Sequence, residues 1–200
     1  HIQWVLQENN RNYHKSPNYE KLRPILGNGL IMSEDDFWLR QRRLIQPAFH
    51  RKRLASLATV MTQAAEIMLD RWQPYSKNGA ALNVADEFMR VTLDVVSRSM
   101  FSTGTNAFEA SIAHNLPIIL EHTNRRFWEV VDLSRLPTPA NRRYRPALEA
   151  LDQVVNRVIE QRQHSGESPD DLMSMLIEAR DADSGEQMNT QQLRDEVMTI

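Results

Sequence analysis

The sequence contains no cysteine among its 200 residues. That absence excludes a disulfide framework and a zinc–thiolate site within this stretch. It also fits a reducing compartment, so we expect a cytoplasmic protein. Long hydrophobic runs are missing too: the most apolar region, residues 54–69, is interrupted by Thr59, Thr62, Gln63 and Glu66. A transmembrane helix requires ~20 nearly uninterrupted apolar residues, so we predict no membrane segment here.

An excess of charge of one sign is also lacking, because the net charge is -2. This value excludes a globally basic nucleic-acid binder, and no aromatic residues interleave with basic ones, so we expect no nucleic-acid partner. The histidines and serines form no H-E-x-x-H or G-x-S-x-G pattern, and we predict no catalytic residue and no metal ligand in this stretch. Two glycine-containing segments, 27–29 and 181–185, are interpreted as tight turns rather than as nucleotide or calcium sites.

The sequence does contain long stretches that glycine and proline leave uninterrupted, since it has only 6 glycines and 9 prolines. Within them, apolar residues recur at steps of three and four, which is the pattern of an amphipathic helix. The helices predicted in this way cover residues 53–73, 84–101, 148–159 and 172–177. Only residues 80–84 suggest a short strand. The predicted fold class is therefore mainly α.

A short helix is also predicted to start at residue 33. Ser33 is a candidate N-cap, and Asp35 and Asp36 would complement the positive end of the helix dipole. Pro47 should end the helix at about Gln46, because proline cannot continue it.

Trp38 and Arg42 lie four residues apart in this predicted helix, so their side chains share one face. The indole N–H and the five guanidinium donors would suit a carboxylate or phosphate. The alternative is a core tryptophan next to a solvated arginine. The same region holds a dense basic cluster, either a solvated helix surface or a docking site for an acidic partner. The cluster comprises Arg40, Arg42, Arg43, Arg51, Lys52 and Arg53.

Several segments together resemble the cytochrome P-450 family of haem-thiolate monooxygenases, in the family's order and over essentially all 200 residues. The most specific is LRPILGNGLIMSEDDFWLRQRRLIQPAFHRKRL, which resembles the loop between the family's B and C helices running into the C helix, with W-x-x-x-R as Trp38 and Arg42. IQWVLQENNRNYHKS precedes it. Two segments resemble the family's F–G region: NLPIILEH and LPTPANRRYRPALEALDQVV. A further segment, DLMSMLIEARDADSGEQM, resembles the H helix and the turn after it. The match ends with MNTQQLRDEVMTI.

The resemblance implies roles for individual residues. Trp38 and Arg42 would donate hydrogen bonds to a propionate of the haem cofactor. Leu22, Leu26 and Ile31 would face a hydrophobic substrate, although an ordinary core position is the alternative for each. Five basic residues would form the surface on which an acidic ferredoxin or flavin domain delivers electrons. That group is Arg40, Arg43, Arg51, Lys52 and Arg53.

The family's cysteine motif, its E-x-x-R pair and its A-G-x-[DE]-T turn do not occur in these residues. We therefore expect residues 1–200 to be an internal portion of one catalytic domain, spanning helices B to the start of I and truncated at both ends. The axial cysteine would lie outside this sequence, and this piece alone would be inactive. The intact protein would use O2 and two electrons to hydroxylate a hydrophobic substrate. The alternative is a non-enzymatic helical module that binds an acidic protein through its basic face.

Overall fold

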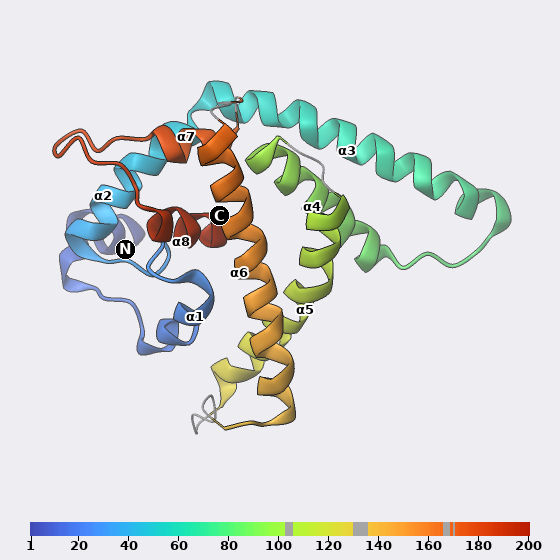
Figure 1. The fold of residues 1–200 in the computed structure, drawn as a ribbon, viewed down its shortest axis with the longest axis horizontal. Helices are drawn as coiled ribbons and strands as arrows, with labels where there is room; N and C mark the ends of the chain where they lie inside the picture. The colour runs from blue at the N-terminus through green and yellow to red at the C-terminus, as the bar shows by residue number, and fades with distance from the viewer. Residues whose placement is uncertain (103–105, 130–135, 166–168, 170) are drawn as a thin grey trace.

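The computed structural model describes residues 1–102, 106–129, 136–165, 169 and 171–200, except for the side chains of residues 52–54, 56 and 106–109. It is an assembly of helices (Figure 1). The α-helices are α1 (Arg23–Leu26), α2 (Asp35–Ile45), α3 (Arg51–Asn78), α4 (Val84–Phe101), α5 (Asn106–Trp128), α6 (Pro139–Ser165), α7 (Leu172–Glu178) and α8 (Thr190–Thr199). The shorter helical turns are η1 (Trp4–Glu8), η2 (Asn10–Asn12), η3 (Pro17–Lys21) and η4 (Gln46–Phe49).

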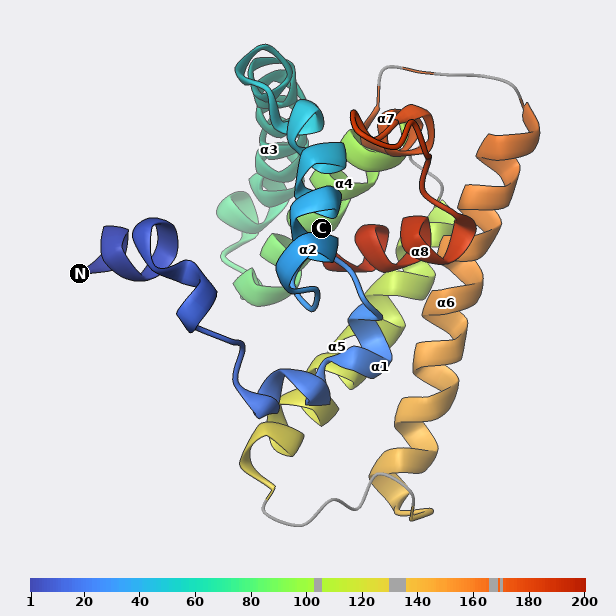
Figure 2. The same ribbon diagram turned by 90° about the vertical axis from the view of Figure 1, so that its left-hand side faces the viewer.

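Helix α6 lies at the centre of the fold. Its apolar residues recur at helical spacing and so form one continuous face. Tyr144, Ala147, Leu151, Val155 and Ile159 are all buried, and they lie on the face that packs against other helices. Helix α5 packs along α6, and α8 crosses the same helix (Figures 1 and 2). This arrangement creates two layers of core that α6 spans.

The two core clusters are joined by α8. One cluster gathers buried residues from α2, α4, α6, α7 and α8, and the other gathers residues from α1, α5 and α6. Met198 of α8 packs against both clusters. The loop before α2 and the body of the fold therefore meet at α8.

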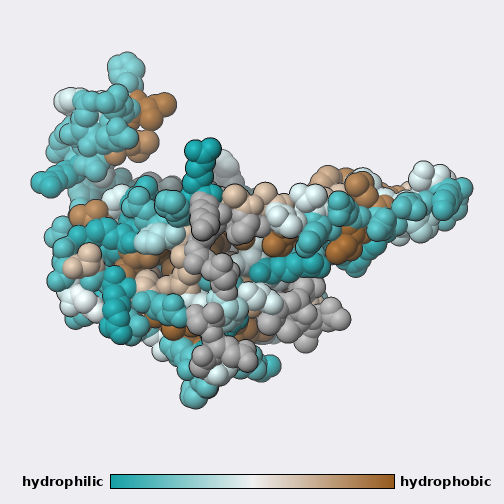
Figure 3. Space-filling model, turned by 90° about the horizontal axis from the view of Figure 1, so that it is seen from above, coloured by the Kyte–Doolittle hydropathy of each residue, from teal (hydrophilic) through white to brown (hydrophobic). Residues whose placement is uncertain are grey.

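Helices α3 and α4 pack against each other, and the end of α3 projects beyond the other helices (Figures 1 and 3). Hydrophobic side chains lie at the surface of this projection (Figure 3). On α4, Val84, Phe88 and Met89 are each more than two fifths exposed. Apolar surface of this extent is characteristic of a face that packs against another chain segment or protein.

The predicted helices are confirmed, but two local predictions are wrong. Residues 80–83 form no strand; Asn83 instead caps α4 by accepting a hydrogen bond from Ala85 N at 3.2 Å. Ser33 does not cap α2, because its Oγ donates to the carbonyl of Leu30 at 3.4 Å. Glu34 occupies the cap position. The carboxylate of Glu34 accepts a hydrogen bond from the backbone N–H of Lys15 at 2.6 Å.

Helix α5 was not among the helices predicted from apolar periodicity. This helix contains Pro117, and proline normally interrupts a helical pattern. Packing along α6 compensates, since Ile119 is completely buried against that helix. The turn at residues 181–185 is confirmed by the hydrogen bond from Gly185 N to Asp181 O at 2.8 Å. In the described part of the chain, no helix is both long enough and apolar enough to cross a bilayer.

Candidate functional site

The aromatic and basic side chains predicted to act as a pair do lie together on α2. The guanidinium carbon of Arg42 is 5.3 Å from the centroid of the Trp38 ring, a cation–π distance. Helical geometry produces this contact, because residues i and i+4 are neighbours on one face. Trp38 is half-buried and Arg42 is exposed.

Arg42 has no ion-pair partner within the described residues, although the chain carries 26 acidic residues. Its guanidinium is held by the indole and retains donors for an external acceptor. The indole N–H beside it is also a donor. The pair can therefore bind a carboxylate by charge-assisted hydrogen bonds, which are about twice as strong as neutral ones.

Two arginines of the basic cluster are instead paired within the chain. Arg40 lies 3.4 Å from the Glu186 carboxylate. Arg43 lies 3.4 Å from Asp181 Oδ1 and also contacts the carboxylate of Asp183. The turn that follows α7 therefore neutralises part of the surface predicted to bind an acidic donor.

The remaining members of the predicted donor surface lie at the start of α3. Arg51 is exposed. The side chains of Lys52 and Arg53 lie outside the described residues. Only one member of the predicted surface, Arg51, is therefore described without a carboxylate partner in the described part of the chain.

The three predicted substrate residues occupy different environments. Leu22 is half-buried where η3 ends. Leu26, at the end of α1, packs against the core cluster that contains Ile119. Ile31 exposes 42% of its surface. Leu26 thus makes the ordinary core contact that the alternative interpretation describes, whereas Ile31 remains available to a ligand.

A buried carboxylate on α8 was not predicted from the sequence. Glu196 is completely buried. Its Oε2 accepts from Leu30 N and its Oε1 accepts from Gln41 Nε2, both at 3.0 Å. Burial raises its pKa to about 7, the two hydrogen bonds oppose this rise, and the neighbouring Asp195 charge adds to it. The signal in the sequence was the run Arg194-Asp195-Glu196, three ionisable residues that an amphipathic helix cannot place on one exposed face.

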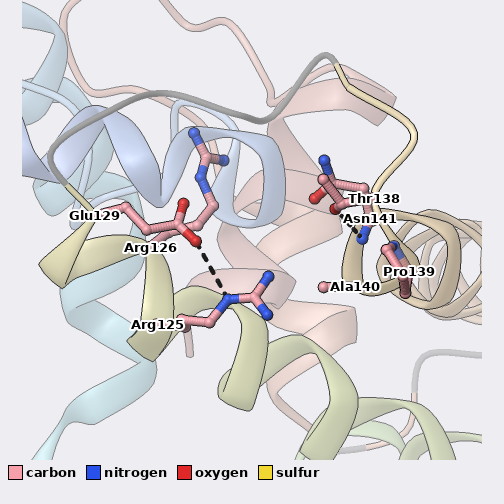
Figure 4. Close-up of a pocket in the computed structure, with 7 residues that line it drawn as sticks. All are labelled: Arg125, Arg126, Glu129, Thr138, Pro139, Ala140 and Asn141. Carbon is pink, nitrogen blue, oxygen red and sulfur yellow. Dashed lines mark hydrogen bonds and ion pairs between the residues drawn. The ribbon is translucent and has the colours of Figure 1, made fainter.

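A separate hollow lies between the end of α5 and the start of α6, with a volume of about 360 Å³ (Figure 4). Arg125 and Glu129 form an ion pair in its wall, with 3.2 Å between Nε and Oε1. Thr138 Oγ1 accepts a hydrogen bond from Asn141 N in the opposite wall. None of the predicted substrate residues contributes to this lining. The hollow is therefore distinct from the predicted substrate loop.

The sequence model of the cytochrome P450 family matches residues 1–200. Among curated proteins, the chain is 38% identical over 187 residues to cyclooctatin synthase of Streptomyces melanosporofaciens, covering 92% of this chain and 40% of that protein. It is 32% identical to pentalenene oxygenase of Streptomyces avermitilis, covering 91% of this chain and 40% of the relative.

A solved structure agrees with these matches. The crystal structure of the cytochrome P450DA heme domain superposes with a TM-score of 0.82 at 26% sequence identity, covering 96% of this chain and 43% of that one. The chain thus spans about two fifths of the length of each of these relatives. The match of the family model, over residues 1–200, includes both the loop before α2 and α2 itself.

Proposed function

Because the chain belongs to the cytochrome P450 family, we propose that the intact protein is a haem-thiolate monooxygenase that hydroxylates a hydrophobic substrate. It would use O2 and two electrons. Residues 1–200 contain no cysteine, so the axial thiolate belongs to a part of the protein outside them. Residues 1–200 alone are then inactive.

The observation that carries this proposal is the arginine on α2 that lacks an internal carboxylate. Arg42 stacks on Trp38 at 5.3 Å and has no ion pair in the described part of the chain. Haem carries two propionates at its rim, and burying a carboxylate requires charge-assisted partners. The indole and guanidinium donors fit one propionate in charge and in number.

The residues of this chain have defined tasks in that reaction. When bound, the haem supplies the oxygen activation, which an axial thiolate favours. Trp38 and Arg42 would hold a propionate of the haem by hydrogen bonds from the indole and the guanidinium. Leu22, Ile31 and the part of Leu26 that its core contact leaves exposed would bind substrate by apolar burial at ~25 cal/mol per Å² and would exclude water from the reacting carbon.

The names of the relatives support a mainly hydrocarbon substrate. One is named pentalenene oxygenase, and another, 32% identical, is named cyclooctat-9-en-7-ol 5-monooxygenase. Both names describe oxygenation of a molecule with little polar surface. Such a substrate matches an apolar loop, because burial rather than hydrogen bonding then provides the affinity.

The electron donor in this proposal is an acidic ferredoxin or flavin domain. Its docking surface consists of Arg40, Arg43, Arg51, Lys52 and Arg53. A basic patch raises the rate of encounter with an acidic protein. The pairing of Arg40 and Arg43 with acids of the turn after α7 reduces this attraction without removing it.

We also propose that residues 1–200 are an internal part of a larger catalytic domain. The coverage of about two fifths of each relative supports this, and so do the exposed apolar side chains of α4. In the larger domain, further chain would cover that face. The expected cytoplasmic location remains part of this proposal.

The test is the reduced, carbon-monoxide-bound absorption spectrum of the full-length protein. We expect the thiolate-ligated haem signature, and an oxygenated product when an electron donor and a hydrocarbon substrate are supplied. A full-length protein that binds no haem would refute the proposal. The alternative, a non-enzymatic module that binds through its basic face, is weakened by the match of the cytochrome P450 family model to residues 1–200.

A further inference from the structure

The loop between α1 and α2 lies directly on α8. A Cβ atom added to Gly27 would lie 2.0 Å from Asp195 Oδ1. One added to Gly29 would lie 2.2 Å from Thr199 Oγ1 and 2.5 Å from the carbonyl oxygen of Asp195. These distances are far below van der Waals contact, so both positions require glycine. Gly27 also has a φ of 55°, which disfavours other residues.

Two adjacent carboxylates of α8 accept hydrogen bonds from alternate backbone N–H groups of this loop. Asp195 Oδ2 accepts from Asn28 N at 2.8 Å. Glu196 Oε2 accepts from Leu30 N at 3.0 Å. An irregular loop must satisfy its buried backbone donors through side chains, because it has no ladder of its own. These two bonds therefore fix the path of the loop.

Each carboxylate is itself held by a further element. Glu196 Oε1 accepts from Gln41 Nε2 on α2, and both residues are completely buried. Asp195 Oδ1 accepts from Arg194 Nη1 at 3.0 Å and from Gln191 Nε2 at 2.8 Å. Arg194 is fixed in turn by Asp152 of α6, with 3.0 Å between Nε and Oδ1. The loop is thereby tied to α2, α6 and α8 together.

We infer that Asp195 and Glu196 are positioning residues that hold the substrate loop in its binding conformation. We call their two hydrogen bonds to Asn28 N and Leu30 N the α8 clasp. The clasp lies between Leu26 and Ile31, two of the proposed substrate residues, and limits how far either can move. This inference rests on the proposed function, since it assigns the clasp a role in substrate affinity rather than in cofactor binding.

The experiment uses the full-length haem protein and three variants. Glu196→Ala removes both bonds of Glu196. Glu196→Gln keeps an acceptor for Leu30 N, and a turned Gln41 amide can pair with its NH2 group. Gly29→Ala keeps both carboxylates but pushes the loop off α8, because the added Cβ clashes with Thr199 and the Asp195 carbonyl. Glu160→Ala, an exposed carboxylate on α6, is the matched control.

Three quantities are measured: haem content, the dissociation constant for a hydrophobic substrate or azole inhibitor from the spectral titration, and hydrogen–deuterium exchange of peptides covering residues 25–33. We expect Glu196→Ala and Gly29→Ala to retain haem, to weaken binding about tenfold, and to speed exchange in this segment. A loss of one buried hydrogen bond corresponds to about that factor. The dissociation constants of Glu196→Gln and Glu160→Ala should stay within about twofold of that of the parent.

The outcomes separate the inference from the proposed function. Wild-type exchange and wild-type ligand affinity in both Glu196→Ala and Gly29→Ala would overturn the clasp while the haem spectrum still stands. If Glu196→Ala does not fold, the Gly29→Ala result decides in the same way, and Glu196→Gln serves as its folded control. A parent protein without the haem signature would overturn the proposed function. The exchange data alone would then decide whether Asp195 and Glu196 hold the loop.

Discussion

Helix α2 presents two faces that differ in what they contact. On one face, Arg42 stacks on Trp38 and has no carboxylate partner in the described part of the chain. The other face is buried, and there Gln41 donates to the hidden carboxylate of Glu196. Arg43, one residue after Arg42, lies about 100° further round the helix and reaches Asp181 and Asp183 instead.

This difference shows why residue type alone does not identify a binding residue. Arg42 and Arg43 are chemically identical and adjacent in sequence, yet one is satisfied within the chain and the other is not. The exposed ion pair of Arg43 with Asp183 contributes only ~0–1 kcal/mol, and the contact of Arg43 with the buried Asp181 supplies that carboxylate with a charge partner. A guanidinium held by an aromatic ring, without an acid beside it, is the arrangement suited to an external anion.

The largest expected effect comes from removing the unpaired arginine. In the full-length protein, Arg42→Ala should speed haem transfer to an excess of apomyoglobin by about ten- to a hundredfold, because one charge-assisted hydrogen bond to a propionate contributes ~1.5–3 kcal/mol. The rate is measured by absorbance after mixing.

Arg43→Ala is the matched control for that measurement. It removes the same charge one residue away, from a side chain whose partners are internal. We expect haem transfer within about twofold of the parent, since both lost partners, the exposed Asp183 and the buried Asp181, belong to the chain itself. Equal acceleration in both variants would mean that net charge, and not the contact on the first face, controls haem retention.

The buried face should respond to pH. Glu196 has its pKa raised from an ordinary value of 4.5 to about 7, mainly by burial and further by the Asp195 charge. The folded state therefore binds this proton more tightly than the unfolded state does. The contribution of Glu196 to stability is complete below pH ~4.5 and is lost as pH rises through about 7.

Glu196→Gln should remove this dependence. Between pH 5 and pH 8, the stability of the variant should rise relative to the parent by roughly 1–3 kcal/mol, which is observed by comparing thermal midpoints of the two proteins at both pH values. Arg42→Ala should leave this pH dependence unchanged because it alters the other face. A constant difference between Glu196→Gln and its parent would show that Glu196 does not change protonation in this range.

The sequence predicted the first face better than the second. The contact between Trp38 and Arg42 follows from helical periodicity alone, which is a local property. The hydrogen bonds to Glu196 join residues that are 155 and 166 positions apart, and no local pattern encodes them. The neutralisation of Arg40 and Arg43 by the turn after α7 is also long-range. Helix α5 was missed because Pro117 obscured a pattern that packing along α6 sustains.

A smaller effect is expected from Trp38→Phe, which separates the two contributions on the first face. Phenylalanine retains an aromatic ring for Arg42 but removes the indole N–H donor. We expect haem transfer to speed up about three- to tenfold, less than in Arg42→Ala, because a neutral donor contributes ~1 kcal/mol. Transfer at the parent rate would indicate that the indole acts only by stacking.

The smallest effect concerns the neutralised flank of α2. Asp183→Asn combined with Glu186→Gln removes two exposed acids that contact Arg43 and Arg40. We expect reduction by an acidic ferredoxin to speed up about two- to threefold at low salt and to depend more steeply on ionic strength, as measured by stopped-flow absorbance. Stability should change by less than ~1 kcal/mol, because both acids are exposed. Charge reversal at Arg40 and Arg43 should slow the same reduction and leave substrate affinity unchanged. If neither pair of substitutions alters the rate or its salt dependence, the donor binds elsewhere, and both flanking arginines serve only to hold the turn after α7.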